Sequence, residues 1–124
     1  QQAPIFQGLS ERQIFLLHAA MTQVSYDEGD VVFKQGEIGD SFYVVISGQA
    51  DVLRTDEGGD QTVLARLGAS ACFGERALLK KEPRYASVIA GKGSEEHPGL
   101  QTMTITREAF ELALEAPISR LLEV

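Results

Sequence analysis

The chain has 124 residues, which is enough for one domain with a modest hydrophobic core. Hydrophobic residues make up 44% of it and charged residues 23%, as is ordinary for a globular fold. The formal net charge of −7 argues against a nucleic-acid partner, whose phosphates it would repel, but it allows a small anion held by a local cation. No apolar run approaches the ~20 residues that a membrane-spanning helix requires.

Metal and disulfide chemistry has little support in the composition. The single cysteine, Cys72, cannot form an internal disulfide, which favours a reducing, cytoplasmic compartment. The two histidines, His18 and His97, lie far apart in the sequence, so we expect no metal site. We expect Cys72 and His18 to pack in the core and His97 to lie in a solvated loop. Because the chain opens at Gln1, without an initiator methionine or a basic leader, we expect a piece of a longer protein.

The first part of the chain has the pattern of an amphipathic helix. Ser10 followed by Gln13 forms a capping-box pattern. Apolar residues then recur at helical spacing, which predicts a helix over residues 10–21. Its apolar stripe must pack either on the rest of this domain or on a partner.

Short strands at hairpin spacing are predicted for the middle of the chain. Turns rich in glycine and acidic residues separate apolar runs that are either alternating or continuous. The predicted strands cover residues 24–26, 31–33, 42–46, 50–54, 62–67, 85–90 and 100–105. A set of about eight short strands over residues 24–105 favours a mainly β fold of the β-roll or jelly-roll type. The run 42–46 has the composition of a strand that is buried on both faces.

The last part of the chain is predicted to be helical again. Thr106 can cap a helix whose apolar face includes Phe110 and Leu114. Pro117 stops that helix and can occupy the first turn of another. We therefore expect helices over residues 106–124, the last of them truncated where the chain ends.

The chemistry of the chain is concentrated in residues 73–86. Gly74 permits a backbone turn that a side chain would forbid, and residues 75–80 are good helix formers. The start of such a helix directs free N–H groups outward and favours an anion. Arg84 carries a planar cation that can hold a phosphate through two hydrogen bonds. Glu75 would repel a phosphate and suits a neutral hydroxyl pair, so the sequence predicts a pocket for a small sugar phosphate.

A family pattern matches this stretch. Residues 73–79 have the sequence Phe-Gly-Glu-Arg-Ala-Leu-Leu, and residues 83–88 have the sequence Pro-Arg-Tyr-Ala-Ser-Val. This resembles the phosphate-binding cassette of the cyclic-nucleotide-binding domain family, which runs F-G-E-x-A-L-L, a short spacer, then P-R-x-A-x-V. Residues 36–48 are similar to the family's G-x-x-G-D-x-F-Y-x-I-x-x-G stretch. The resemblance covers nearly the whole chain and implies one domain, residues 1–124, built as an eight-stranded antiparallel β-roll with helices at both ends.

The resemblance also implies a role for each residue of the site. Arg84 would bind the exocyclic oxygens of a cyclic phosphate, and Glu75 would bind the ribose 2′-hydroxyl. Gly74 and the backbone N–H groups near Arg76 and Ala77 would complete the cradle. The full predicted set of ligand-binding residues is Phe73, Gly74, Glu75, Arg76, Ala77, Arg84, Tyr85 and Ala86.

Ordinary structural roles compete with some of these assignments. Arg84 could form a surface salt bridge with Glu82, and Glu75 could stabilise the dipole of its own helix. Asp51 suits the solvated face of a strand, whereas the resemblance implies that it steadies Arg84 from behind. Arg76 stands where the family tolerates variety, and we expect it to be solvated, with a partner contact as the alternative.

Tyr85 departs from the family pattern. The residue after the arginine is usually threonine in cyclic-GMP-dependent kinases and alanine in cyclic-AMP-dependent kinases. Tyr85 could offer its hydroxyl to the purine, stack on it or block the pocket. Residues 73–79 and 82–84 look most similar to the cyclic-GMP-dependent kinases of protozoan parasites, so we favour cyclic GMP over cyclic AMP.

The resemblance implies a regulatory domain of a serine/threonine protein kinase rather than an enzyme. No nucleophile–base pair or metal constellation is visible, so we expect no catalytic residue and no cofactor beyond the nucleotide ligand. Nucleotide binding would repack the apolar end helices and relieve inhibition of an attached kinase domain. The main alternative is a degenerate, non-binding module that serves docking. A bacterial transcription regulator would need a DNA-binding helix pair, and a cupin-type enzyme would need a His/Glu cluster in the strands; neither is present in the sequence.

Overall fold

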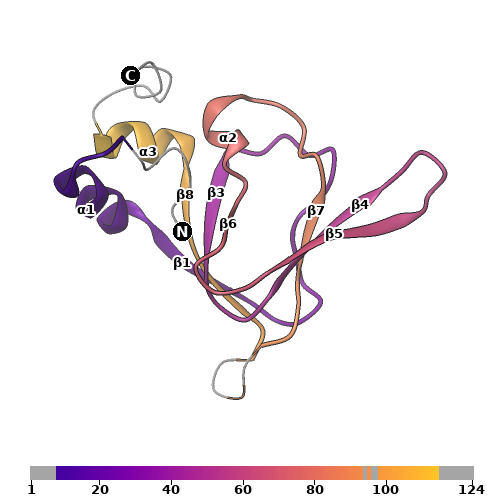
Figure 1. Ribbon diagram of the computed structural model, residues 1–124. Coiled ribbons are helices and arrows are strands. Elements are labelled where there is room, and N and C mark those ends of the chain that lie inside the picture. The colour runs from indigo at the N-terminus through magenta and orange to yellow at the C-terminus, as the bar shows by residue number, and fades with distance from the viewer. Residues whose placement is uncertain (1–7, 94, 96–97, 115–124) are drawn as a thin grey trace.

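Two antiparallel sheets and a group of helices at one end make up the part of the chain that the structure describes (Figure 1). The computed structural model describes residues 8–93, 95 and 98–114. One sheet has the strand order β1-β8-β3-β6 and the other the order β2-β7-β4-β5, so the predicted eight-stranded, mainly β fold with flanking helices is confirmed. The strands are β1 (Thr22–Tyr26), β2 (Val31–Phe33), β3 (Ser41–Ser47), β4 (Ala50–Thr55), β5 (Gln61–Leu67), β6 (Cys72–Phe73), β7 (Ser87–Ala90) and β8 (Leu100–Thr106). The helices are α1 (Glu11–Ala20), α2 (Arg76–Leu79) and α3 (Arg107–Leu114).

Helix α1 begins where the capping-box pattern predicts it. The Ser10 hydroxyl accepts from the Gln13 N–H at 3.2 Å, and the Gln13 side-chain oxygen accepts from the Ser10 N–H at 2.8 Å. The helix ends at Ala20. The expectation that His18 packs in the core is wrong: Leu17 takes the buried position, and His18, about 100° further round the helix, is exposed.

Helix α3 closes the same end of the molecule and packs on α1. The Thr106 hydroxyl accepts from the Ala109 N–H at 3.1 Å and caps the helix as predicted. Phe110 and Leu114 are buried, which confirms the expected apolar face. The helix expected after Pro117 lies outside the described residues. None of the three helices that the structure describes is long and apolar enough to cross a membrane.

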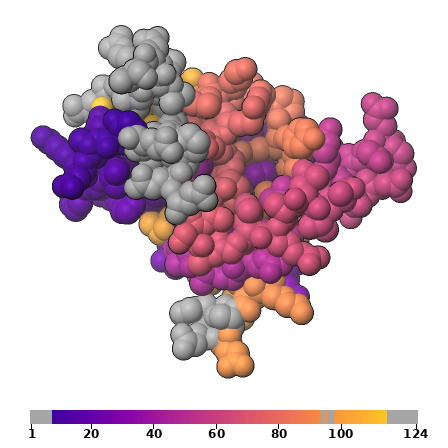
Figure 2. Space-filling model, in the orientation of Figure 1, coloured from indigo at the N-terminus to yellow at the C-terminus, as the bar shows by residue number. Residues whose placement is uncertain are grey.

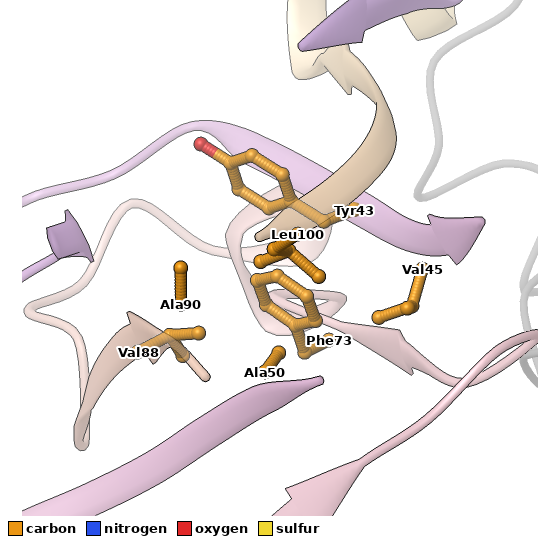
Figure 3. Packing of buried hydrophobic residues seen from close by; sticks show 7 residues of the cluster. All are labelled: Tyr43, Val45, Ala50, Phe73, Val88, Ala90 and Leu100. Carbon is orange, nitrogen blue, oxygen red and sulfur yellow. The ribbon is translucent and has the colours of Figure 1, made fainter. Parts of the chain in front are cut away.

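Two apolar clusters form the core. The first, the helix cluster, joins the helices to the sheet that contains β3 and β8, and it contains Leu17, Phe42, Leu78, Ile105, Phe110 and Leu114. The second, the sheet cluster, joins the two sheets and contains Tyr43, Val45, Ala50, Phe73, Val88, Ala90 and Leu100 (Figure 3). Because successive strand residues point to opposite faces, β3 supplies its neighbours Phe42 and Tyr43 to different clusters. The expectation that residues 42–46 are buried on both faces is wrong for Ile46, which is 43% exposed where the pairing with β8 shifts register.

Strand β6 has only two residues, Cys72 and Phe73, and the sequence does not predict it. They pair with Val44 and Tyr43 of β3. A run of two residues has no periodicity, so only its pairing partner identifies it. Cys72 packs against the helix cluster but is half-buried rather than fully buried. Phe73 stacks on Tyr43 with a centroid distance of 4.9 Å and an angle of 6° between the rings, which ties the cassette to the sheet.

Tyr26, at the end of β1, makes the stability of the fold depend on pH in the alkaline range. Burial, the charge of Tyr43 and a hydrogen bond with Tyr43 raise the pKa of Tyr26 from its ordinary value of 10.0 to about 12. Because folding raises the pKa of Tyr26, the neutral phenol contributes its full stabilisation of the folded state below pH 10.0, the pKa of Tyr26 in the unfolded chain. The stabilisation is then lost as the pH rises through the folded value of about 12.

Replacing Tyr26 with phenylalanine should therefore flatten the alkaline loss of stability. We expect the wild-type free energy of unfolding to fall by about 1 kcal/mol more than that of Tyr26→Phe between about pH 10 and pH 12, a figure discounted for the partial exposure of the ring. Urea unfolding at a series of pH values measures the difference. Tyr85→Phe, at an exposed tyrosine, is the matched control, and parallel curves for wild type and Tyr26→Phe would contradict the prediction.

Candidate functional site

A cavity of about 260 Å³ opens between residues 73–86 and the sheet that contains β4. The space-filling view shows the surface hollowed between the salmon-coloured atoms of this segment and the magenta atoms of β4 and β5 (Figure 2). All of the predicted ligand-binding residues line it: Phe73, Gly74, Glu75, Arg76, Ala77, Arg84, Tyr85 and Ala86. The structure thus brings the whole predicted set together around one cavity, although Gly74 and Arg84 are ten positions apart in the chain.

Gly74 turns the chain from β6 into helix α2. Its φ of +79° lies in the left-handed region that side chains rarely adopt. A Cβ there would lie 2.8 Å from the Ser41 carbonyl oxygen and 3.0 Å from Arg84 Nη1. Helix α2 starts two residues later, but its first N–H groups are not all free, because the Ala77 N–H donates to the Gly74 carbonyl at 3.1 Å. A ligand that used the Ala77 N–H would have to compete with that bond.

The backbone of Arg84 is held by the loop between β2 and β3. The Arg84 N–H donates to the Glu37 carbonyl at 2.7 Å, and the Gly36 N–H donates to the Arg84 carbonyl at 2.8 Å. Just before it, Pro83 forms an isolated antiparallel bridge with Ile38. These contacts position Arg84 before any ligand arrives.

The guanidinium group of Arg84 is half-buried beside the cavity. Its Nη2 donates to the Ser41 carbonyl at 2.9 Å, and its Cζ lies 3.9 Å from the centroid of the Phe33 ring. Its Nε is buried without a hydrogen-bond partner. Burial lowers the pKa of Arg84, while the charges of Tyr43, Asp40 and Glu37 raise it, and an arginine remains cationic throughout. A fixed, partly desolvated cation is the group that an anionic ligand would stabilise most.

Glu82, the alternative salt-bridge partner of Arg84, pairs with Arg76 instead. The Arg76 Nε donates to Glu82 Oε1 at 2.7 Å, and the Arg76 side chain is 72% exposed. This hydrogen bond and the opposite charge raise the pKa of Arg76 and lower the pKa of Glu82. Arg76 is thus solvated as expected, and the pair spans the rim of the cavity from helix α2 to the segment before Pro83.

Glu75 immediately precedes helix α2 and lines the cavity. Its backbone is already helical, with φ −57° and ψ −36°, and its side chain makes no capping hydrogen bond to the helix. The cavity therefore has a carboxylate and the Arg84 cation in the same lining. A carboxylate accepts hydrogen bonds from hydroxyl groups and a guanidinium donates to phosphate oxygens, which is the pairing that a ribose phosphate requires.

Asp51 does not lie where the resemblance places it. Its Oδ1 accepts from Gln49 Nε2 at 2.7 Å, and its carboxylate lies beside Gly91, where a Cβ would be 3.0 Å away. The reason is the alternation of strand β4: Val52 lines the cavity, so its neighbour Asp51 points to the opposite face of the sheet. The expected support of Arg84 by Asp51 is not found, and the Phe33 ring occupies the supporting position.

Five further residues line the cavity. Glu82 and Pro83 belong to the segment 73–86, whereas Phe33, Val52 and Val88 come from outside it and were not expected from the sequence. They come from β2, β4 and β7 of one sheet. The sequence pattern of a strand predicts which of its residues are buried, but it does not predict which cavity a buried residue lines. The sequence therefore contained no signal that these three residues belong to the site. Across the part of the chain that the structure describes, no three His, Cys, Asp or Glu side chains form a group that could hold a metal ion, and His97 lies outside that part.

Known proteins have sequences and folds similar to those of this chain. The family model of the cyclic nucleotide-binding domain matches residues 23–95, which is more than half of the chain. The chain is 42% identical over 107 residues to the cGMP-dependent protein kinase egl-4 of Caenorhabditis elegans, a match that covers 86% of this chain and 13% of the kinase. It therefore spans only about an eighth of that relative's length.

Solved structures with similar folds come from both bacteria and eukaryotes. The N-terminal domain of a transcriptional regulator from Streptomyces coelicolor A3(2) superposes with a TM-score of 0.82 at 27% identity, over 98% of this chain and 84% of that chain. The regulatory domain of Toxoplasma gondii PKA, solved with cAMP, has a TM-score of 0.76 at 26% identity, over 97% of this chain and 44% of that chain. With its family pattern, its cavity and these likenesses in agreement, the chain belongs to the cyclic nucleotide-binding domain family.

Proposed function

We propose that this chain is a regulatory domain that binds a cyclic nucleotide and prefers cyclic GMP to cyclic AMP. The observation that carries the proposal is the presence of Arg84 and Glu75 in the lining of one cavity. Arg84 supplies a positioned cation for the cyclic phosphate, and Glu75 supplies acceptors for the ribose 2′-hydroxyl. A free phosphate or a neutral sugar would use only one of the two groups.

The dimensions of the cavity suit a ligand of this size. At about 260 Å³ it lies just below the ~300–1,000 Å³ of typical ligand pockets. It can enclose the sugar phosphate and leave the base at its mouth, where Tyr85 lies. A cyclic nucleotide of about 23 heavy atoms, at ~0.3 kcal/mol per atom, gives roughly 7 kcal/mol and a Kd near 10 μM.

We further propose that binding relieves the inhibition of an attached serine/threonine kinase domain. Helix α2 connects the site to the end helices, because Ala77 lines the cavity while its neighbour Leu78 is buried in the helix cluster with Leu17 and Phe110. A ligand that draws α2 inward must move Leu78, and a close-packed cluster responds by repacking α1 and α3. The 42% identity with a cGMP-dependent kinase supports a kinase parent.

The second candidate is a degenerate module that binds no nucleotide and serves docking. The observation that favours it is Tyr85, a large ring at the mouth of the cavity that is 64% exposed. Calorimetric titration with cyclic GMP and with cyclic AMP distinguishes the two candidates. The proposal predicts saturable binding near 10 μM, with the tighter value for cyclic GMP. An absence of both binding heat and thermal stabilisation at millimolar concentrations of either nucleotide would favour the docking module.

Gly39 provides a test of how Arg84 is positioned. A Cβ at this residue would lie 2.2 Å from Arg84 Nε and 2.5 Å from Cζ, although the backbone there is outside the left-handed region. Gly39→Ala should displace the guanidinium without straining the backbone. We expect the affinity for the nucleotide to fall about tenfold, or ~1.4 kcal/mol, while the free energy of unfolding changes by less than about 1 kcal/mol.

The matched control is Gly68→Ala, because an added Cβ at Gly68 meets no atom within 4 Å and its φ is also ordinary. Calorimetry and urea unfolding of both variants complete the comparison. Equal nucleotide affinities in the two variants would show that the Arg84 side chain can bind phosphate from another position.

A further inference from the structure

We propose that Arg54 and Tyr85 act together to recognise the nucleobase. In this arrangement the Tyr85 ring is the platform on which a purine stacks, and Arg54 is the positioning residue that fixes the ring. The inference rests on the proposed function, because it assigns the base of the cyclic nucleotide to the mouth of the same cavity.

Arg54 holds Tyr85 at two points. Its Cζ lies 3.9 Å from the centroid of the Tyr85 ring, and its Nη1 donates to the Tyr85 backbone carbonyl. Arg54 belongs to β4, so a strand of the sheet fixes a residue of the cassette across 31 positions of sequence. A ring that is already fixed loses little conformational freedom when a ligand stacks on it.

The position of the ring matches the place where the base must lie. The lining of the cavity includes three aromatic residues, Phe33, Phe73 and Tyr85, and of these Tyr85 is the exposed one, at 64%. Phe33 and Phe73 pack with Tyr43 beneath the site, with centroid distances of 4.9–5.9 Å among the three rings. Since about 260 Å³ accommodates the sugar phosphate, the base extends to the mouth and meets Tyr85.

The charge of Arg54 favours stacking of a base on the Tyr85 ring, and the larger overlap of a purine favours it over a smaller base. A guanidinium over one face of the ring draws electron density toward itself and leaves the ring a better partner for an electron-rich base. Stacking on an aromatic side chain increases with the overlap of the two rings, and every base has a face that can take part. The arginine thus acts through Tyr85 and need not touch the base.

The test measures the Kd of cyclic GMP for Arg54→Gln, Tyr85→Ala, Tyr85→Phe and the double variant Arg54→Gln/Tyr85→Ala. We expect Tyr85→Ala to weaken binding about tenfold or more, and Arg54→Gln to weaken it about threefold to fivefold. Tyr85→Phe keeps the ring and should stay within about twofold of the wild type. The double variant should bind no more weakly than Tyr85→Ala, because Arg54 acts only through the ring.

Two controls separate this inference from an effect on the fold or on the phosphate site. Arg66→Gln removes an exposed arginine of the neighbouring strand β5 and should leave the Kd unchanged. Methyl riboside 3′,5′-cyclic phosphate has the sugar and the cyclic phosphate but no base. Its Kd, measured by competition, should therefore be the same for the wild type and all four variants.

Each alternative result has a distinct meaning. Wild-type affinity for cyclic GMP in both Tyr85→Ala and Arg54→Gln, with binding lost in Arg84→Ala, would overturn the recognition of the base and leave the proposed function intact. Loss of affinity for the base-free riboside in the Tyr85 and Arg54 variants would also overturn it, since the variants would then act on the phosphate site. A wild-type chain that binds no cyclic nucleotide would overturn the inference and the proposed function together.

Discussion

Replacing Arg84 with alanine is expected to weaken cyclic-nucleotide binding at least a hundredfold, from a Kd near 10 μM to about 1 mM or above. A hydrogen bond to a charged group contributes ~1.5–3 kcal/mol, and the planar guanidinium can make two such bonds to one phosphate. Backbone hydrogen bonds with Glu37 and Gly36 fix the position of Arg84 beside the cavity. Calorimetric titration of wild type and variant measures the loss.

The same substitution should leave the folded state nearly as stable as before. The burial that lowers the pKa of Arg84 is a cost, and it offsets the hydrogen bond to Ser41 and the contact with Phe33. We expect the free energy of unfolding without ligand to change by less than about 1 kcal/mol. Binding and folding are therefore separable at this residue.

Two further variants sharpen the result. Arg84→Lys keeps the charge but loses the planar pair of donors, so its affinity should fall between those of wild type and Arg84→Ala. Arg66→Ala removes the same charge from an exposed position on β5 and tests for a general electrostatic effect. If Arg84→Ala bound cyclic GMP within about fivefold of the wild type, the phosphate would have to be held by other groups.

Replacing Phe110 with alanine is expected to lower the free energy of unfolding by about 3–5 kcal/mol. Phe110 is fully buried in the helix cluster, where α3 meets Leu17 of α1 and Phe42 of β3. A domain of this size has about 5–15 kcal/mol of stability in total, so the variant should lose a large part of it. Urea unfolding followed by far-ultraviolet circular dichroism measures the difference.

Phe15 provides the matched control, because it is the same residue type on α1 but is 70% exposed. Phe15→Ala should change the free energy of unfolding by less than about 0.5 kcal/mol. A loss below about 1.5 kcal/mol in Phe110→Ala would mean that α3 does not depend on this cluster for its position. Saturating cyclic GMP should raise the stability of Phe110→Ala by mass action, since the variant leaves the lining of the cavity unchanged.

Local chemistry explains which parts of the candidate site could be predicted. Gly74, Glu75 and Arg84 have distinctive side chains or backbone requirements at a specific spacing, and the structure places all three around the cavity. Arg54 gave no such signal, because an arginine in a strand is ordinary, and only the fold reveals that it covers the Tyr85 ring. The role of Phe33 could not be predicted either, because its contact with Arg84 joins residues that are 51 positions apart.

Elements with local signals could be predicted from the sequence. The capping box at Ser10, the cap at Thr106 and the turn at Gly74 depend on residues within three or four positions of one another, and all three appear in the structure. The alternating and apolar runs likewise identified seven of the strands within a few residues of their ends.

Contacts between distant segments could not be predicted from the sequence and are seen only in the folded chain. Strand β6 exists because Tyr43 and Val44 of β3 pair with it. Asp51 points away from the site because the register of β4 turns Val52 toward the cavity. Pairing and register depend on the packing of both sheets at once, and a single strand's sequence does not contain that information.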